Sequence, residues 1–147
     1  MKKISFVLIM AAAVLLLLPL TGCPSELSDL SWGGPAVGDV VGDMNGDGLV
    51  LSSTGAAGVY KTATFVYAND MTAWGGGTGT INCKIRAKAG NWGTSYGAGG
   101  QPTIGGEFVK ADGGGNFTVS GFTVGSNYHF EVKSTRELGV MIKVVKE

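Results

Sequence analysis

The chain reads Tyr128-His129-Phe130-Glu131-Val132-Lys133-Ser134-Thr135 and, after four residues, Val140-Met141-Ile142-Lys143-Val144-Val145-Lys146, and these two runs determine its fold class. Apolar residues occupy alternate positions in both runs. Successive side chains of a strand point to opposite faces, so a period of two predicts half-buried β-strands. The residues between them, Arg136-Glu137-Leu138-Gly139, provide a turn. The two runs therefore predict a β-hairpin.

Weaker runs of the same period occur earlier in the chain, between stretches rich in glycine. The predicted strands are Val37–Met44, Gly58–Ala68, Ile81–Ala89, Glu107–Lys110 and Asn116–Phe122. Two segments, Asp70–Thr80 and Ala89–Gly106, contain so much glycine that we expect long loops there. About seven short strands with glycine-rich turns favour an all-β fold, a single β-sandwich.

The start of the chain has the pattern of a secretory signal. Lys2 and Lys3 precede an apolar stretch of 17 residues that is too short to span a membrane, since a spanning helix needs about 20. The sequence Leu20-Thr21-Gly22-Cys23 resembles the bacterial lipobox, which implies removal of residues 1–22 and acylation of Cys23. The alternative is an ordinary signal peptide, after which Cys23 pairs with Cys83. We expect a lipidated tether over residues 23–36 and the β-sandwich over residues 37–147.

The charge and the cysteine content limit the kinds of molecule that the chain is expected to bind. Loss of Lys2 and Lys3 from eleven basic side chains leaves nine against eleven acidic ones, a net charge of −2. This balance gives no electrostatic reason to bind nucleic acid or anionic lipid, so we expect membrane contact through acyl chains alone. Proline rather than aspartate after Cys23 favours export to an outer membrane or the cell surface. With Cys23 acylated, Cys83 has no disulfide partner, and we expect it in the core.

The spacing of polar residues supports no catalytic or metal-binding set. The segment Asp43-Met44-Asn45-Gly46-Asp47-Gly48 resembles the start of a calcium loop, but the twelfth position is Thr54 and supplies no carboxylate. The single histidine, His129, directly precedes Phe130 in a predicted strand, so the two side chains point to opposite faces, and we expect His129 to face solvent. No Ser/His/Asp set can be assembled around it. We therefore expect no metal, no cofactor and no enzymatic activity.

Aromatic residues in the glycine-rich segments are the candidate binding residues. Trp92 and Tyr96 follow the strand Ile81–Ala89 directly. A large ring is costly to expose unless it covers the core or meets a ligand. Sugar rings offer C–H faces that stack on aromatic rings, and their hydroxyls need polar partners such as Lys84 and Asn91. Packing of the aromatic rings within the loop remains the alternative.

Several short motifs follow one another in the order of a known family. In chain order they are Val41-Gly42-Asp43-Met44-Asn45-Gly46, Gly58-Val59-Tyr60-Lys61, the strand with Lys84, Asn91-Trp92-Gly93, Tyr96-Gly97, Gly113–Val119, Tyr128–Val132 and Ile142–Val144. This order resembles the domain of the SusE/SusF starch-utilisation outer-membrane lipoproteins. It is also similar to the starch- and glycogen-binding modules of pullulanases and of the AMP-activated kinase regulatory subunit. Over about residues 37–147, the resemblance implies an immunoglobulin-like (early-set) β-sandwich that binds glycan, such as an α-glucan, without catalysis.

The resemblance also implies roles for individual residues. Trp92 matches the tryptophan that stacks on glucose, and Lys84 and Asn116 match residues that reach sugar hydroxyls. Asp47 stands where the family usually has a second tryptophan, so half of the platform is missing unless Trp74 replaces it. Two functions therefore stay open. One is glycan binding, with stacking by Trp92, Tyr96 and Trp74 and hydroxyl contacts from Lys84, Asn91 and Asn116. The other is a structural or protein-interaction lipoprotein without a sugar site.

Overall fold

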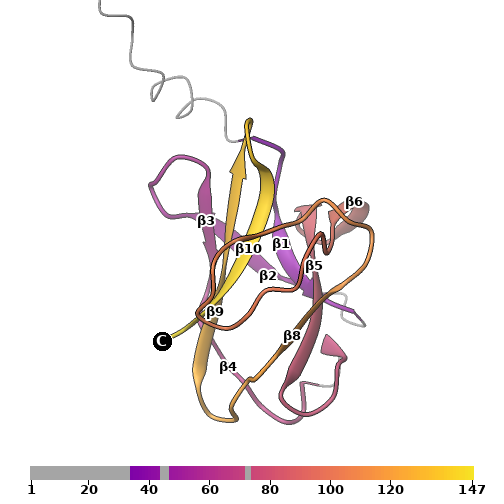
Figure 1. Ribbon diagram of the computed structural model, residues 1–147, viewed down its shortest axis with the longest axis vertical. Coiled ribbons are helices and arrows are strands. Elements are labelled where there is room, and N and C mark those ends of the chain that lie inside the picture. Colours follow the sequence, from indigo (N-terminus) through magenta and orange to yellow (C-terminus); the bar gives the residue numbers. More distant parts are fainter. Residues whose placement is uncertain (1–33, 44–46, 72–73) are drawn as a thin grey trace, which may run out of the picture.

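A computed structural model describes residues 34–43, 47–71 and 74–147, and ten strands run through them (Figure 1). The strands are β1 (Asp39–Gly42), β2 (Leu49–Ser53), β3 (Val59–Thr62), β4 (Phe65–Val66), β5 (Thr80–Lys88), β6 (Asn91–Tyr96), β7 (Val109–Lys110), β8 (Phe117–Ser120), β9 (Asn127–Thr135) and β10 (Gly139–Lys146). All pairings between them are antiparallel, which confirms the predicted all-β class. The described part of the chain contains no helix of the length and apolarity that a membrane crossing requires. Cys23, the predicted signal and most of the predicted tether lie outside the described residues.

The predicted terminal hairpin is confirmed. Its strands β9 and β10 pair with Val132 opposite Ile142 and Phe130 opposite Val144. These four side chains are fully buried because the period of two places them on one face, toward the core. The turn ends at Gly139, whose φ of 72° lies in the left-handed region that favours glycine.

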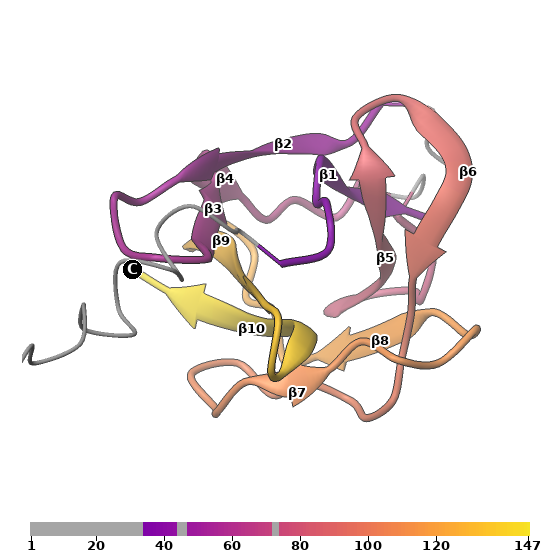
Figure 2. The same ribbon diagram turned by 90° about the horizontal axis from the view of Figure 1, so that it is seen from above.

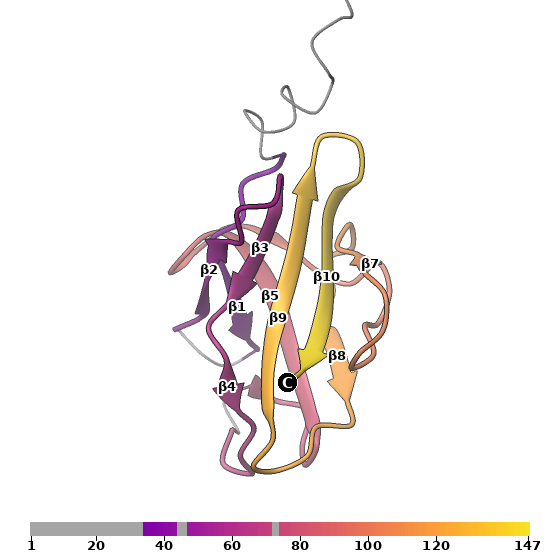
Figure 3. The ribbon, with the colours of Figure 1, turned by 90° about the vertical axis from the view of Figure 1, so that its left-hand side faces the viewer.

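Hydrogen bonds join the strands into one curled sheet, with the order β6-β5-β1-β2-β3-β9-β10-β7 (Figure 2). Strand β4 also pairs with β9, and β8 pairs with β5. The curl depends on β2, which pairs through Val50 with Asp39 in β1 and then through Ser52 with Lys61 in β3. Seen from the side, β3, β9 and β10 lie next to one another along the length of the domain (Figure 3).

The concave side of this sheet encloses an aromatic core. Phe65 lies parallel to Trp74 with 6.3 Å between ring centroids, and Phe130 is 5.5 Å from Phe65. Phe122 meets Tyr128 edge to face at 4.7 Å. Such ring pairs contribute roughly 0.5–1.5 kcal/mol each beyond the burial of their area. These rings come from four separate segments, so they hold the curled sheet closed.

Cys83 lies in the core, as predicted from its alternation with Ile81 and Ile85. All three side chains are fully buried. Burial raises the pKa of the Cys83 thiol to about 12. The thiol therefore stays protonated at physiological pH and packs as a small apolar group.

The strand prediction was wrong in three places. The run Gly58–Ala68 divides into β3 and β4, and at the break the amide of Phe130 donates to the hydroxyl of Thr62 at 3.1 Å. Strand β2 was not predicted. The segment Ala89–Gly106, expected to be a loop, contains β6, which pairs with β5 after a tight turn at Gly90.

Candidate functional site

The outward surface of β1 and β5 brings together most of the predicted binding residues. Lys84 and Arg86 alternate with the buried Cys83 and Ile85, so they project to the opposite side of the sheet. The register places Asp39 beside Arg86. Trp92 from β6 and Asn116 at the start of β8 lie on the same side, as their contacts below show. We call this surface, defined by Asp39, Lys84, Arg86, Trp92 and Asn116, the Trp92 face.

An ion pair lies at the centre of the Trp92 face. The Nε of Arg86 donates to Oδ1 of Asp39 at 2.8 Å, and a second guanidinium nitrogen donates to Oδ2. Their side chains are only 1% and 2% exposed. Hydrogen bonding to Asp39 raises the pKa of Arg86, against the opposing effect of burial. The two parallel bonds form the bidentate arrangement that fixes both side chains strongly.

Trp92 covers this ion pair. The guanidinium carbon of Arg86 lies 5.0 Å from the indole centroid, which is cation–π geometry. The indole remains 50% exposed. A bulge makes this position possible, because β6 advances from Ser95 to Asn91 while β5 advances only from Arg86 to Lys88. One side of the ring therefore contacts the protein and the rest is open to solvent.

The predicted hydroxyl partners already hold contacts within the protein. Lys84 Nζ donates to the carbonyl of Gly114 at 2.8 Å. The side-chain amide of Asn116 donates to Asp43 Oδ1 at 2.5 Å. Both side chains are half-buried. An ammonium group has three donors and an amide group two, so each of these residues keeps donors for a ligand.

Asn91 shapes the turn next to Trp92. Its side-chain oxygen accepts from the amide of Gly93 at 2.7 Å, and the residue is exposed. This local bond from an asparagine to a backbone amide two residues later is an Asx turn. This bond within the turn fixes the orientation of the Asn91 side-chain amide.

The structure corrects the placement of two predicted stacking residues. Trp74 is only 6% exposed and lies parallel to both Phe65 and Phe130 in the core. Tyr96 is half-buried, pairs with the core residue Ile85 and packs against the core. Neither ring is presented beside Trp92. Among the large exposed apolar side chains of the described residues, Trp92 is the single aromatic one.

Asp47 lies near the Trp92 face. The residue is exposed, and its negative charge contributes to the raised pKa of Arg86. At the position where the resembled family has a second tryptophan, this chain therefore places a carboxylate within electrostatic reach of the ion pair. The second ring is absent and Trp74 does not replace it.

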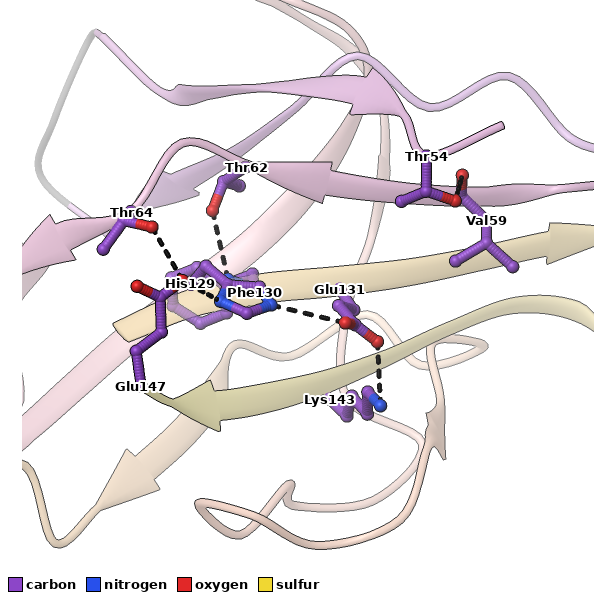
Figure 4. Close-up of polar contacts among 9 residues, drawn as sticks. All are labelled: Thr54, Val59, Thr62, Thr64, His129, Phe130, Glu131, Lys143 and Glu147. Carbon is purple, nitrogen blue, oxygen red and sulfur yellow. Dashed lines mark hydrogen bonds and ion pairs between the residues drawn. The ribbon is translucent and has the colours of Figure 1, made fainter. Parts of the chain in front are cut away.

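A second polar cluster lies on the outer side of β9 and β10 (Figure 4). His129 Nδ1 is 3.0 Å from Glu147 Oε1, and His129 Nε2 is 3.3 Å from Glu131 Oε1. Lys143 Nζ pairs with the other oxygen of Glu131 at 2.8 Å, and the Thr64 hydroxyl donates to Glu147 at 2.8 Å. The expectation that His129 faces solvent is wrong, because these neighbours leave it 8% exposed.

The contacts of His129 do not form a catalytic arrangement in this cluster. Both ring nitrogens meet carboxylate oxygens, and the nearby hydroxyl of Thr64 donates to Glu147 and not to the imidazole. A nucleophile needs its hydroxyl hydrogen-bonded to the base. The cluster instead joins Thr64, the residue before β4, to the strand pair β9 and β10.

The described residues contain no group of three His, Cys, Asp or Glu side chains arranged to hold a metal ion. In the segment that resembles a calcium loop, residues 44–46 lie outside the described residues, and Asp43 bonds to Asn116. A hollow of about 230 Å³ lies next to the beginning of β5 and is lined by Tyr67, Asn69, Met71, Gly75, Gly77 and Thr78. These residues provide neither a carboxylate nor an imidazole.

Comparison of the chain with profiles of protein families, with curated proteins and with solved structures found no match. The proposed function therefore rests on the geometry of the site.

Proposed function

We propose that the chain is a membrane-anchored lipoprotein whose domain binds glycan without catalysis at the cell surface. The observation that carries this proposal is the half-exposed indole of Trp92, which is held against Arg86 on a face that also presents Lys84 and Asn116. An exposed ring with polar donors around it suits the C–H faces and hydroxyls of a sugar. Because a single ring is presented, we expect weak binding of a few sugar units, as one component of a polysaccharide-capture system.

The fold that we propose is the immunoglobulin-like (early-set) β-sandwich of the starch-binding modules. Two features support this assignment. The curled sheet has two halves that face each other across one core, and β2 passes from one half to the other. The short connection through β2 and the aromatic core suit a small sandwich. Glucan is accordingly the first glycan to test.

The anchor in this proposal is an acylated Cys23, with residues 23–36 as a tether. The described part of that tether already contacts the domain, because the hydroxyl of Ser134 donates to the carbonyl of Pro35. Replacement of Cys23 by serine should release the protein from the membrane fraction, as a fractionation and immunoblot would show. Retention of the Cys23→Ser variant in the membrane would contradict the lipoprotein assignment.

A structural or protein-interaction lipoprotein is the second candidate. The burial of Trp74 and the presence of Asp47 in place of a ring favour it, because they leave a single exposed ring. In this case the domain keeps its fold and presents the Trp92 face to another protein, such as an outer-membrane partner.

Glycan binding separates the two candidates. The full chain in detergent is tested by affinity gels and calorimetry against α- and β-glucans, next to Trp92→Ala and the control Val66→Ala. Val66 is also an exposed apolar residue but lies on β4. We expect Trp92→Ala to abolish binding and Val66→Ala to preserve it. Binding that survives Trp92→Ala would rule out the Trp92 face as the glycan site, and no binding to any glycan would leave the structural candidate.

A further inference from the structure

The ion pair beneath Trp92 is enclosed by backbone as well as by the indole. The amide of Gly90 donates to Asp39 Oδ2 at 3.2 Å. A Cβ atom on Gly48 would lie 2.4 Å from the same carboxylate oxygen, and a Cβ on Gly38 would lie 2.2 Å from the nitrogen of Ala89. Real Cβ atoms do not approach so closely, so only glycine fits at these two positions. The backbone at Gly48 and Gly90 is therefore packed directly against the pair, and Gly38 packs against the backbone of the turn before Gly90.

The position of this pair is unusual for a device that serves stability alone. Asp39 and Arg86 are buried although the strand alternation places them on the outer side of the sheet, opposite the core residues Val40 and Ile85. Apolar side chains of similar volume generally stabilise such a position at least as well as an ion pair. A guanidinium held by two bonds does what an apolar side chain cannot, because the bonds fix the plane of a charged group.

We propose that the Asp39–Arg86 pair is a positioning element that holds the indole of Trp92 in one orientation, as a preformed contact surface for a ligand. The inference that this surface serves glycan rests on the proposed function. A side chain that is ordered before binding loses less conformational freedom when the ligand arrives. The bulge in β6 and the Asx turn at Asn91 fix the backbone of Trp92, and the guanidinium of Arg86 fixes its ring.

The order of the ring can be measured without any ligand. The chain contains three tryptophans, so 5-fluorotryptophan labelling gives three fluorine resonances, and Trp92→Phe assigns one of them. In the double variant Asp39→Asn/Arg86→Met, which leaves no buried charge, the Trp92 resonance should sharpen and move toward the position of free fluorotryptophan. The other two resonances should stay in place. An unchanged Trp92 resonance in the folded double variant would overturn the proposal.

Arg86→Lys is a second test variant, which is used in case the double variant does not fold. Arg86→Lys keeps the positive charge opposite Asp39 but lacks the planar fork. We expect the Trp92 resonance to move in this variant too, whereas the control Ile142→Val, a mild core change far from the Trp92 face, should not affect it. A resonance that stays at its wild-type position in Arg86→Lys would likewise contradict a positioning role.

Glycan binding is measured in parallel on an α-glucan gel. If the wild-type chain binds, the double variant should bind about threefold to tenfold more weakly, as expected when one side chain must be ordered on binding. Equal binding by both would overturn the proposal. If the wild-type chain binds no glycan, the proposed function fails, and the Trp92 resonance still decides whether the pair positions the ring.

Discussion

Removal of Arg86 alone should destabilise the domain far more than removal of the whole ion pair. Arg86→Met leaves the carboxylate of Asp39, 2% exposed, without its two guanidinium bonds. An uncompensated buried charge costs about 3–5 kcal/mol of unfolding free energy. In Asp39→Asn/Arg86→Met no charge remains, and the asparagine oxygen can still accept from Gly90. Only its unpaired amide costs about 1–3 kcal/mol.

Urea unfolding of the wild type, the single variant and the double variant tests this difference. The slopes of the three transitions should agree, so that their midpoints report stability alone. We expect the double variant to recover about 2 kcal/mol of the loss in Arg86→Met, which is the difference between the centres of the two ranges. The reasoning would be refuted by a single-variant loss below about 1 kcal/mol, or by a double variant no more stable than the single one.

Three further outcomes follow from the burial and charges of single residues. Trp74→Ala should lose about 3–5 kcal/mol in urea unfolding, since it removes a buried ring, whereas Trp92→Ala should lose less than half as much. Equal losses would contradict the opposite exposures of the two rings. Because burial raises the pKa of Cys83 to about 12, its thiol should resist Ellman's reagent at pH 8 in the folded protein and react in urea. Fast labelling without urea would show an accessible thiol. Burial acts to raise the pKa of Glu131, but bonds such as that from Lys143 outweigh it and lower the pKa below its ordinary 4.5. Its contribution is therefore present above pH 4.5 and is lost as the pH falls through the lowered pKa. Glu131→Gln should reduce the stability difference between pH 7 and pH 3 by about 0.5–1 kcal/mol, and an unchanged difference would contradict this linkage.

The strands whose bounds were predicted most closely are those with a regular apolar face. Alternate positions are apolar in both strands of the terminal hairpin and in the strand with Cys83, although Met141 and Val145 are also apolar on the other face of β10. Strand β6 has the sequence Asn-Trp-Gly-Thr-Ser-Tyr, which has no apolar period and contains a central glycine. Its extended conformation comes from pairing with β5 and from the turn at Gly90, and a local pattern does not report such tertiary contacts.

The candidate site was predicted in part for a related reason. Lys84 and Trp92 were recognisable from residue type and order, because both lie in or beside a clear strand. The partners of Trp74 were not recognisable from the sequence, since Phe65 lies in β4 and Phe130 in β9. The Asp39–Arg86 pair joins residues 47 positions apart. The opposite charges of Asp39 in β1 and Arg86 in β5 are visible in the sequence, but they indicate a pair only when β1 and β5 are known to pair.

The division of β2 between two partners has a consequence for how the domain opens. Val50 pairs with β1 and Ser52 with β3, so the two halves of the sheet share one strand of five residues. Separation of the halves would break the pairing of β2 on at least one side and expose the aromatic rings between them. Separation of the halves is therefore costly, and the backbone amides of β1 and β3 should exchange with deuterium slowly and at similar rates.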